Sequence, residues 1–160
     1  MIRAYVGLGS NLGEPREQVE RALRELARLP RTRLARRSSL YRSDPLGYAG
    51  QPPYVNAVAE IETDLGAREL LGELQALEAR HARTRSFANA PRTLDLDLLL
   101  YGEEILDSPD LVLPHPRMHE RGFVLEPLLE LDPAIAIPGI GPAAARLAAC
   151  AGQGVERIAG

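Results

Sequence analysis

The chain has 160 residues, 45% of them hydrophobic and 26% charged, which is typical of one globular domain with its own hydrophobic core. A net charge of −3 without any basic run argues against a large nucleic-acid interface. No apolar run approaches the roughly 20 residues that span a bilayer, and the first residues resemble a strand rather than a signal peptide, so we expect a cytoplasmic protein.

The first hundred residues predict a strand, a helix, two strands, a helix and a strand. The first three elements are a strand over 2–9, a helix from Pro15 that Pro30 ends, and a strand over 32–41. A strand over 54–63 and a helix over 67–83 follow. This order predicts an α+β fold of the ferredoxin-like, split βαβ type, with an antiparallel or mixed sheet backed by two helices.

The later residues predict shorter elements added to this sheet within a single domain over 1–160. After the strand that ends near residue 101, Gly102 should turn a hairpin toward Leu106. We expect an apolar turn over 123–131, a helix opened by Pro142, and a last strand over 155–158. The single cysteine, Cys150, excludes an internal disulfide and is expected in the core.

Asp95 and Asp97 interrupt one of the most apolar runs of the chain. Because alternate side chains of a strand project to opposite faces, both carboxylates should share one face, and Leu94, Leu96 and Leu98 the other. Like charges this close repel each other and resist desolvation, so a cation would relieve both costs. The pair favours Mg²⁺, which one or two carboxylates hold together with substrate phosphates. The alternative is an edge strand whose acidic face is solvated.

All 19 basic residues are arginines, which excludes a Walker lysine and Schiff-base chemistry. Arg83, Arg85 and Arg92 bracket an irregular stretch directly before the two acids. Guanidinium groups bind phosphate bidentately, so three of them near two carboxylates suit a triphosphate. For Arg83, a solvated position at a helix C-terminus is the alternative.

Three further features each leave two interpretations open. The glycine-rich segment 7–13 matches neither a dinucleotide fingerprint nor a Walker loop, and is either a tight turn or a backbone support for a bound phosphate or ring. His115, between two prolines, is either a rigid loop residue or a ligand contact, whereas His81 is expected on a polar or boundary helix face in a structural role. Tyr54 and Phe123 either pack in the core or hold a flat heterocycle.

The chain resembles the 6-hydroxymethyl-7,8-dihydropterin pyrophosphokinases over essentially its whole length. The motifs that carry the resemblance are Gly9-Ser10-Asn11-Leu12, Pro45-Leu46-Gly47, Tyr54-Val55-Asn56-Ala57, Pro91-Arg92-Thr93-Leu94-Asp95-Leu96-Asp97, Pro114-His115 and Arg121-Gly122-Phe123. The resemblance implies transfer of the diphosphate of ATP to the hydroxymethyl group of the dihydropterin, with release of AMP, in folate biosynthesis.

The resemblance also implies which residues form the site. The catalytic positions would be Asp95, Asp97, Arg83 and Arg92, with both aspartates as ligands of two Mg²⁺ ions. The positions that match the ATP site are Leu71, Gln75, Glu78, Arg85, Arg92, Leu98, His115 and Arg121. Those that match the pterin site are Ser43, Pro45, Leu46, Tyr54, Asn56 and Phe123, with Phe123 stacking on the ring. The loops at 43–53 and 84–91 would close over both substrates and exclude water.

The chain departs from the family pattern in two places. Asn89-Ala90 stands where many members carry Trp-Gly, and Phe87 is the candidate to replace the missing ring over the pterin. Asp110 replaces a basic residue and Pro116 an aromatic one near the nucleotide, so contacts to adenine and ribose are expected to differ.

Two rival functions remain open at the level of sequence. A nucleotidyltransferase on the same fold would also use Mg²⁺ but would release pyrophosphate instead of AMP. A regulatory or RNA-binding module would need aromatic side chains and a basic face on its central strands, where this chain has Asp95 and Asp97. We expect small-molecule substrates only, no nucleic-acid or membrane partner, and a monomer rather than a dimer.

Overall fold

The computed structural model describes residues 1–44, 52–82 and 94–158 and the backbone of Arg83, and it forms a mixed α/β fold around an antiparallel sheet. In chain order the strands are β1 (Ile2–Ser10), β2 (Thr32–Arg37), β3 (Tyr41–Ser43), β4 (Tyr54–Thr63), β5 (Asp95–Tyr101), β6 (Leu106–Ser108), β7 (Leu111–Leu113), β8 (Ala136–Ile137), β9 (Gly141–Pro142) and β10 (Val155–Arg157). The helices are α1 (Pro15–Leu26), α2 (Ala67–Arg83), α3 (Gly122–Leu131) and α4 (Ala144–Leu147), with short 3-10 turns η1 (Met118–Glu120) and η2 (Ala148–Cys150).

The main sheet is built on the long central pair β1 and β4. Its strand order is β10-β3-β4-β1-β5, and every pairing is antiparallel. The two central strands pair along their full length, from Ile2 opposite Thr63 to Ser10 opposite Val55. Strand β2 also pairs with β4, beside the half that β3 leaves free. The acidic strand β5 therefore lies at one edge of this sheet, next to β1, and not among the central strands, where Asp95 and Asp97 had been expected.

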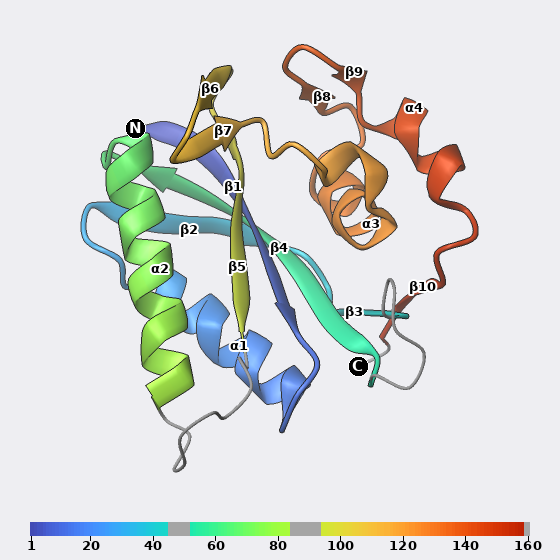
Figure 1. Ribbon diagram of the computed structural model, residues 1–160, viewed down its shortest axis with the longest axis horizontal. Helices are drawn as coiled ribbons and strands as arrows, with labels where there is room; N and C mark the ends of the chain where they lie inside the picture. The colour runs from blue at the N-terminus through green and yellow to red at the C-terminus, as the bar shows by residue number, and fades with distance from the viewer. Residues whose placement is uncertain (45–51, 84–93, 159–160) are drawn as a thin grey trace.

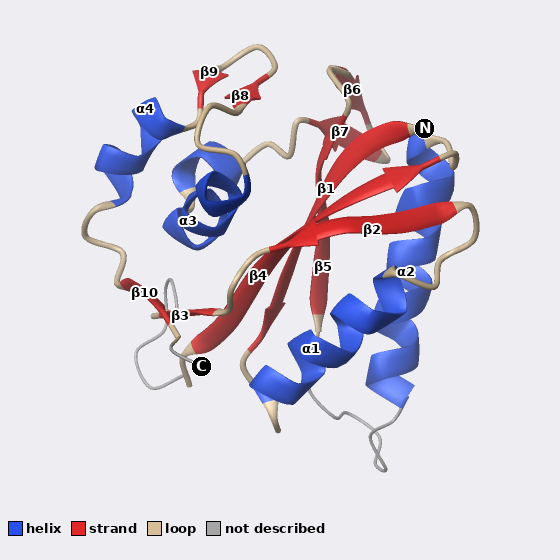
Figure 2. Cartoon of the chain, turned by 180° about the vertical axis from the view of Figure 1, so that it is seen from behind, coloured by secondary structure: helices blue, strands red, loops and turns tan. Residues whose placement is uncertain are grey.

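Helices α1 and α2 cover one face of the sheet, and α3 covers the other (Figure 1, Figure 2). The first face buries Val19, Leu23 and Leu26 of α1 with Leu70, Leu74 and Leu77 of α2. The second face buries Val124, Leu125 and Leu128 of α3 against Leu99 and Leu100 of β5. Both apolar layers share the central strands, so the sheet is a wall between two cores.

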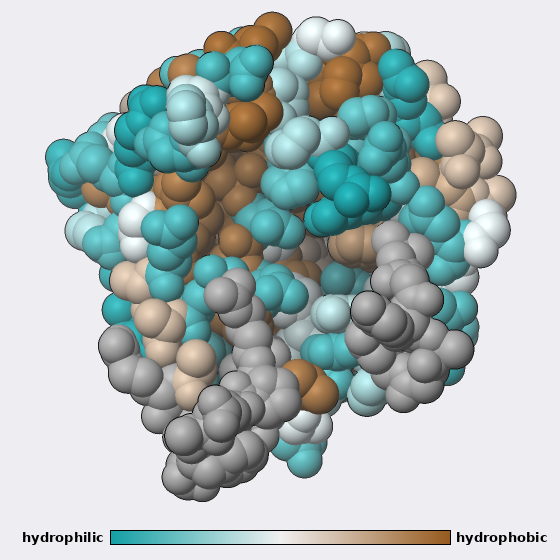
Figure 3. Space-filling view, viewed as in Figure 1, coloured by the Kyte–Doolittle hydropathy of each residue, from teal (hydrophilic) through white to brown (hydrophobic). Residues whose placement is uncertain are grey.

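On the face seen in Figure 3, hydrophobic residues gather between α2 and α3, and hydrophilic residues surround them. In the part of the chain that the structure describes, no helix is long and apolar enough to cross a membrane.

The central predictions are confirmed: the strand over 54–63 and the helix over 67–83 have the predicted bounds. The strand predicted over 32–41 is interrupted, because Ser38 turns its hydroxyl to the Ser39 carbonyl at 2.7 Å and also accepts the Val58 N–H at 2.9 Å. A side chain that bonds to nearby backbone competes with the regular strand ladder. The result is two strands, β2 and β3.

Three further predictions were wrong. The turn at Gly102 leads into β6, which pairs with β7 and not with β5. The segment 123–131 is a helix, α3, which is buried on several sides and therefore lacks the amphipathic period that marks a surface helix. His81 is fully buried instead of lying on a polar or boundary face. Its ring nitrogens contact Gln18 at 2.6 Å and Glu25 at 2.5 Å, so the structural role expected for it is confirmed.

Candidate active site

The two acids of β5 project from the sheet face opposite to the α1–α2 core. Leu94, Leu96 and Leu98 are buried in that core, whereas Asp95 is exposed and Asp97 is partly exposed. The predicted separation of acids and leucines onto two faces is confirmed. Beyond the acids, Leu98, Leu99 and Leu100 are all buried, as expected for a strand covered on both faces.

Side chains and backbone from outside the sheet hold the free edge of β5. The Leu96 N–H, between the two acids, donates to Glu78 Oε2 of α2 at 2.7 Å. Further along, the Leu99 carbonyl accepts the His115 N–H at 2.9 Å. Backbone groups on the outer side of an edge strand have no neighbouring strand to bond to. These two hydrogen bonds satisfy such groups in β5 and fix the position of Asp95 and Asp97.

Two cationic or titratable side chains approach Asp97 from the segment that leads into α3. His115 Nε2 lies 3.9 Å from Asp97 Oδ1, and Arg121 Nη1 lies 3.8 Å from Oδ2. Burial lowers the pKa of His115 below 6.5, and the charges of Arg121 and Arg117 oppose the raising effect of Asp97. The imidazole is therefore neutral at neutral pH, and Arg121 supplies the positive charge beside Asp97.

The other side of the site is polar at its base and aromatic at its rim. The buried Ser43 hydroxyl donates to Asn56 Oδ1 at 2.6 Å, which fixes the amide of Asn56. A Cβ atom at Gly9 would lie 3.0 Å from Asn56 Nδ2, so the strand β1 can approach this amide only through a glycine. The guanidinium of Arg121 lies over the Phe123 ring, 5.6 Å from its centroid, and so fixes the rim.

These elements line an open cavity of about 540 Å³ at the ends of β1, β4 and β5, between α2 and the start of α3. Of the predicted site residues, its lining contains Ser43, Tyr54, Asn56, Leu71, Gln75, Glu78, Asp95, Asp97, Arg121 and Phe123. Site residues predicted from segments up to 80 positions apart thus meet around one cavity.

Some predicted site residues are placed differently or cannot be placed. The side chain of Leu98 lies in the α1–α2 core, and His115 reaches the site through Asp97 without lining the cavity. Pro45, Leu46, Arg85, Arg92 and the side chain of Arg83 lie outside the described residues, as do Phe87 and Asn89.

The structure also adds cavity residues that the sequence reasoning did not assign. Asp44 lines the cavity beside Ser43, and Val124 lines it beside Phe123. The available sequence signal for each residue is that it directly follows a predicted pterin contact. Gly7 and Gly9 line it as well, and they belong to the glycine-rich segment for which a supporting role had been left open.

Asp110 provides an exposed contact away from this lining. Its carboxylate accepts from Arg68 Nε at 2.8 Å, and hydrogen bonds from Arg68 and Ser108 lower the pKa of Asp110 to about 2. Asp110, the position where the resemblance implies a basic residue in other members, is thus the acidic partner of an exposed ion pair.

The donor set at β5 fits a hard divalent cation bound together with a ligand. Among the described residues, no group of three or more histidine, cysteine, aspartate or glutamate side chains forms a complete cage for a metal ion. Two carboxylates open to a cavity supply only part of a coordination shell. Mg²⁺ is commonly bound in this way, with water and phosphate oxygens completing the octahedron.

Among its described residues, this cavity combines carboxylates, an arginine, aromatic rings and a fixed amide, which is typical of an enzyme that handles a charged, flat small molecule. The family model of 7,8-dihydro-6-hydroxymethylpterin-pyrophosphokinase (HPPK) matches residues 5–133. The chain belongs to this family.

Individual relatives agree with the family match. The chain is 51% identical over 158 residues to the 2-amino-4-hydroxy-6-hydroxymethyldihydropteridine pyrophosphokinase of Pseudomonas aeruginosa, covering 99% of this chain and 98% of the relative. It is 49% identical over 138 residues to the Haemophilus influenzae protein of the same name, covering 86% of each. A solved HPPK-DHPS structure in complex with substrates has a TM-score of 0.71 at 11% identity; the match covers 92% of this chain and 43% of that one, and shows the fold alone.

Proposed function

We propose that this chain transfers the diphosphate of ATP to the hydroxymethyl oxygen of 6-hydroxymethyl-7,8-dihydropterin and releases AMP, as a cytoplasmic enzyme of folate biosynthesis. The hydroxymethyl oxygen forms a bond to the β-phosphorus and loses its proton to solvent, the bond between that phosphorus and the α–β bridging oxygen breaks, and AMP leaves with the electron pair. The observation that carries the proposal is the pair Asp95 and Asp97, which opens into the cavity beside Arg121.

The nucleotide side of the site would be held by charge and by shape. Asp95 and Asp97 would hold two Mg²⁺ ions, which, when bound, neutralise phosphate charge and orient the transferred group. Arg121 has its guanidinium within reach of this position, and Arg83, Arg85 and Arg92 are assigned to the same phosphates from the sequence. The remaining ATP contacts are assigned to Leu71, Gln75, Glu78, Leu98 and His115.

The pterin side would hold a flat, polar ring. Asn56, fixed by Ser43, can present its amide to the edge of a heterocycle, while Phe123 can stack on its face. Tyr54, Pro45 and Leu46 are assigned to the same pocket. In this reaction the protein contributes chiefly by positioning both substrates and by excluding water, which would otherwise compete as the acceptor.

We also propose a ferredoxin-like, split βαβ fold for this chain. In the main sheet, β2 and β3 lie beside β4, and β1 and β5 follow, while two helices cover one face. This arrangement supports the ferredoxin-like assignment for a single domain over 1–160.

The test is AMP formation by the purified full chain. We expect AMP only when ATP, Mg²⁺ and the dihydropterin are all present, because each contributes to one ternary complex. AMP released at an equal rate without the dihydropterin, or no AMP with all three, would reject the proposed transfer.

A further inference from the structure

The side-chain amide of Gln153 brackets the backbone of Arg121. The Gly122 N–H donates to Gln153 Oε1 at 2.8 Å, and Gln153 Nε2 donates to the Glu120 carbonyl at 2.8 Å. Arg121 lies between these two bonds, with an extended backbone (φ −115°, ψ 110°) where η1 ends and α3 begins. A single amide thus fixes the main chain on both sides of the arginine that faces Asp97.

Tight packing also holds the backbone at Gly122, next to Arg121. A Cβ atom at Gly122 would lie 3.2 Å from Val155 Cγ2 and 3.3 Å from Cys150 Cβ. These distances are shorter than ordinary van der Waals contacts between carbon atoms. The backbone at Arg121 and Gly122 therefore packs directly against the C-terminal segment, and only a glycine fits at this contact.

Gly154, which follows Gln153 in the C-terminal segment, contacts the side of the cavity formed by the end of β3. The Asp44 N–H donates to the Gly154 carbonyl at 3.2 Å, and Ser43 pairs with Val155 in the β3–β10 ladder. Gly154 has a positive φ of 67°, and a Cβ atom there would clash with Asp44 Oδ2. Residues 153–155 therefore contact both walls of the pterin side.

We propose that Gln153 is a positioning residue of the active site, which keeps the Arg121 guanidinium at Asp97 and over the Phe123 ring. Arg121 is 3.8 Å from Asp97, so a small displacement of its backbone changes what it can contact. The role rests on the proposed function, because it is defined by how Arg121 and Phe123 meet the substrates. Gln153 lies beyond the residues that the family model matches, which end at 133.

The test uses Gln153→Met, which keeps the length of the side chain and removes both hydrogen bonds, and Gln153→Glu, which keeps only an acceptor for the Gly122 N–H. We expect the KM for the dihydropterin to rise and kcat/KM to fall by about tenfold in Gln153→Met, because a displacement of less than an ångström at a reacting centre is costly. Gln153→Glu should also raise this KM, since its carboxylate cannot donate to the Glu120 carbonyl. The matched control, Glu156→Gln, changes an exposed residue in the same segment and should behave as the parent.

Amide hydrogen exchange of Gly122 supplies a readout that does not depend on activity. Exchange should accelerate at least about tenfold in Gln153→Met if the amide of Gln153 protects this backbone. An unchanged KM, with a kcat that falls only in proportion to the unfolded fraction, would overturn the positioning role, as would unchanged Gly122 exchange. If the parent protein makes no AMP, the proposed function fails, whereas accelerated exchange would still support the hold of Gln153 on the backbone at Gly122.

Discussion

Asp97 lies where three parts of the chain meet: the edge strand β5, the residues before η1, and the start of α3. Its carboxylate has His115 Nε2 at 3.9 Å and Arg121 Nη1 at 3.8 Å. With 42% of its side chain exposed, Asp97 does not carry the full cost of a buried charge. This partial exposure leaves the carboxylate available for a cation that enters with a phosphate ligand.

The first prediction at this scale concerns Asp97→Ala. We expect turnover to fall by at least about 100-fold, because removal of one group that stabilises developing charge commonly has this effect. The free energy of unfolding should change by less than about 1 kcal/mol, since the side chain is partly exposed and its loss relieves repulsion with Asp95. Steady-state kinetics and urea unfolding measure the two quantities.

The control for this variant is Asp107→Ala, which removes an exposed carboxylate from the short strand β6. It should leave turnover within about twofold of the parent. Near-normal turnover in Asp97→Ala would remove the assignment of Asp97 as a metal ligand.

Residues with a local pattern could be predicted from the sequence, and residues defined by distant contacts could not. The alternation of Asp95 and Asp97 with leucines is a period of two and needs no knowledge of the tertiary fold. Asp44 has only the adjacent Ser43 to suggest a role, and nothing near Gln153 in the chain distinguishes it from a solvated residue. Their contacts appear only when β10 returns to β3 and α3.

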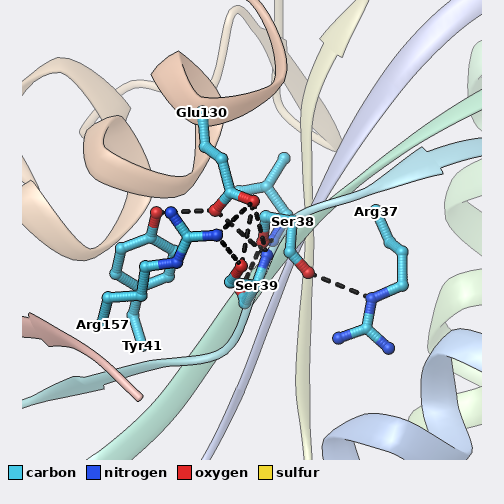
Figure 4. Close-up of polar contacts among 7 residues, drawn as sticks. Arg37, Ser38, Ser39, Tyr41, Glu130 and Arg157 are labelled. Atoms are coloured by element: carbon cyan, nitrogen blue, oxygen red, sulfur yellow. Dashed lines mark hydrogen bonds and ion pairs between the residues drawn. The ribbon is translucent and has the colours of Figure 1, made fainter. Parts of the chain in front are cut away.

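At the scale of elements, α3 is attached to the sheet at the end remote from the cavity by Glu130. Its carboxylate accepts the Ser39 N–H at 3.0 Å and the Tyr41 hydroxyl at 2.7 Å, and Arg157 lies 3.5 Å away (Figure 4). Burial alone would raise the pKa of Glu130, but hydrogen bonds from Tyr41 and Ser39 outweigh it and lower the pKa. Burial and Glu130 together raise the pKa of Tyr41.

Glu130→Gln should therefore destabilise the protein in a pH-dependent way. A carboxyl group whose pKa is lowered by folding stabilises the native state above its unfolded pKa, and this contribution is lost as the pH falls through the folded pKa. We expect a loss of roughly 1 kcal/mol at about pH 7, the size of a net hydrogen bond to a charged, partly exposed group. The difference from the parent should shrink as the pH falls below about 4.5.

Urea unfolding at several pH values measures this difference, and Glu126→Gln, on the same helix, is the matched control. A stability difference that stays constant from neutral to acidic pH would show that the charge of Glu130 does not contribute.

Helix α3 also shows why some elements escape prediction from sequence. The helix α2 has one apolar stripe, so its period is visible, and its predicted bounds are confirmed. In α3, buried residues occupy most positions and Pro127 interrupts the pattern, which resembles a turn. The packing against β4 and β5 decides its conformation, and that information is not local.

For the whole molecule, the sheet is shared by two cores, which predicts that the two layers do not unfold separately. Strand β5 contributes Leu96 and Leu98 to one core and Leu99 and Leu100 to the other. Loss of either layer would expose one face of the same strands to water, at a cost proportional to the apolar area exposed. The order of the central elements and the burial of Leu98, Leu99 and Leu100 on both faces could be predicted from the sequence, but the helix that forms the second layer could not.

We therefore expect one cooperative thermal transition for the full chain, with equal calorimetric and van't Hoff enthalpies. Because a monomer is expected, Tm should not change with protein concentration. Differential scanning calorimetry and circular dichroism provide the measurement. Two resolved transitions would contradict a single domain, and a Tm that rises with concentration would contradict a monomer.

The proposed reaction is tested most directly by ³¹P NMR of the full chain with ATP, Mg²⁺ and 6-hydroxymethyl-7,8-dihydropterin. The account predicts that the β- and γ-phosphorus atoms of ATP are recovered together as a diphosphate ester of the pterin, with AMP as the nucleotide product. Free pyrophosphate with AMP joined to the pterin would instead identify a nucleotidyltransferase. That outcome, or unchanged ATP, would contradict the central claim that Asp95 and Asp97 serve diphosphate transfer.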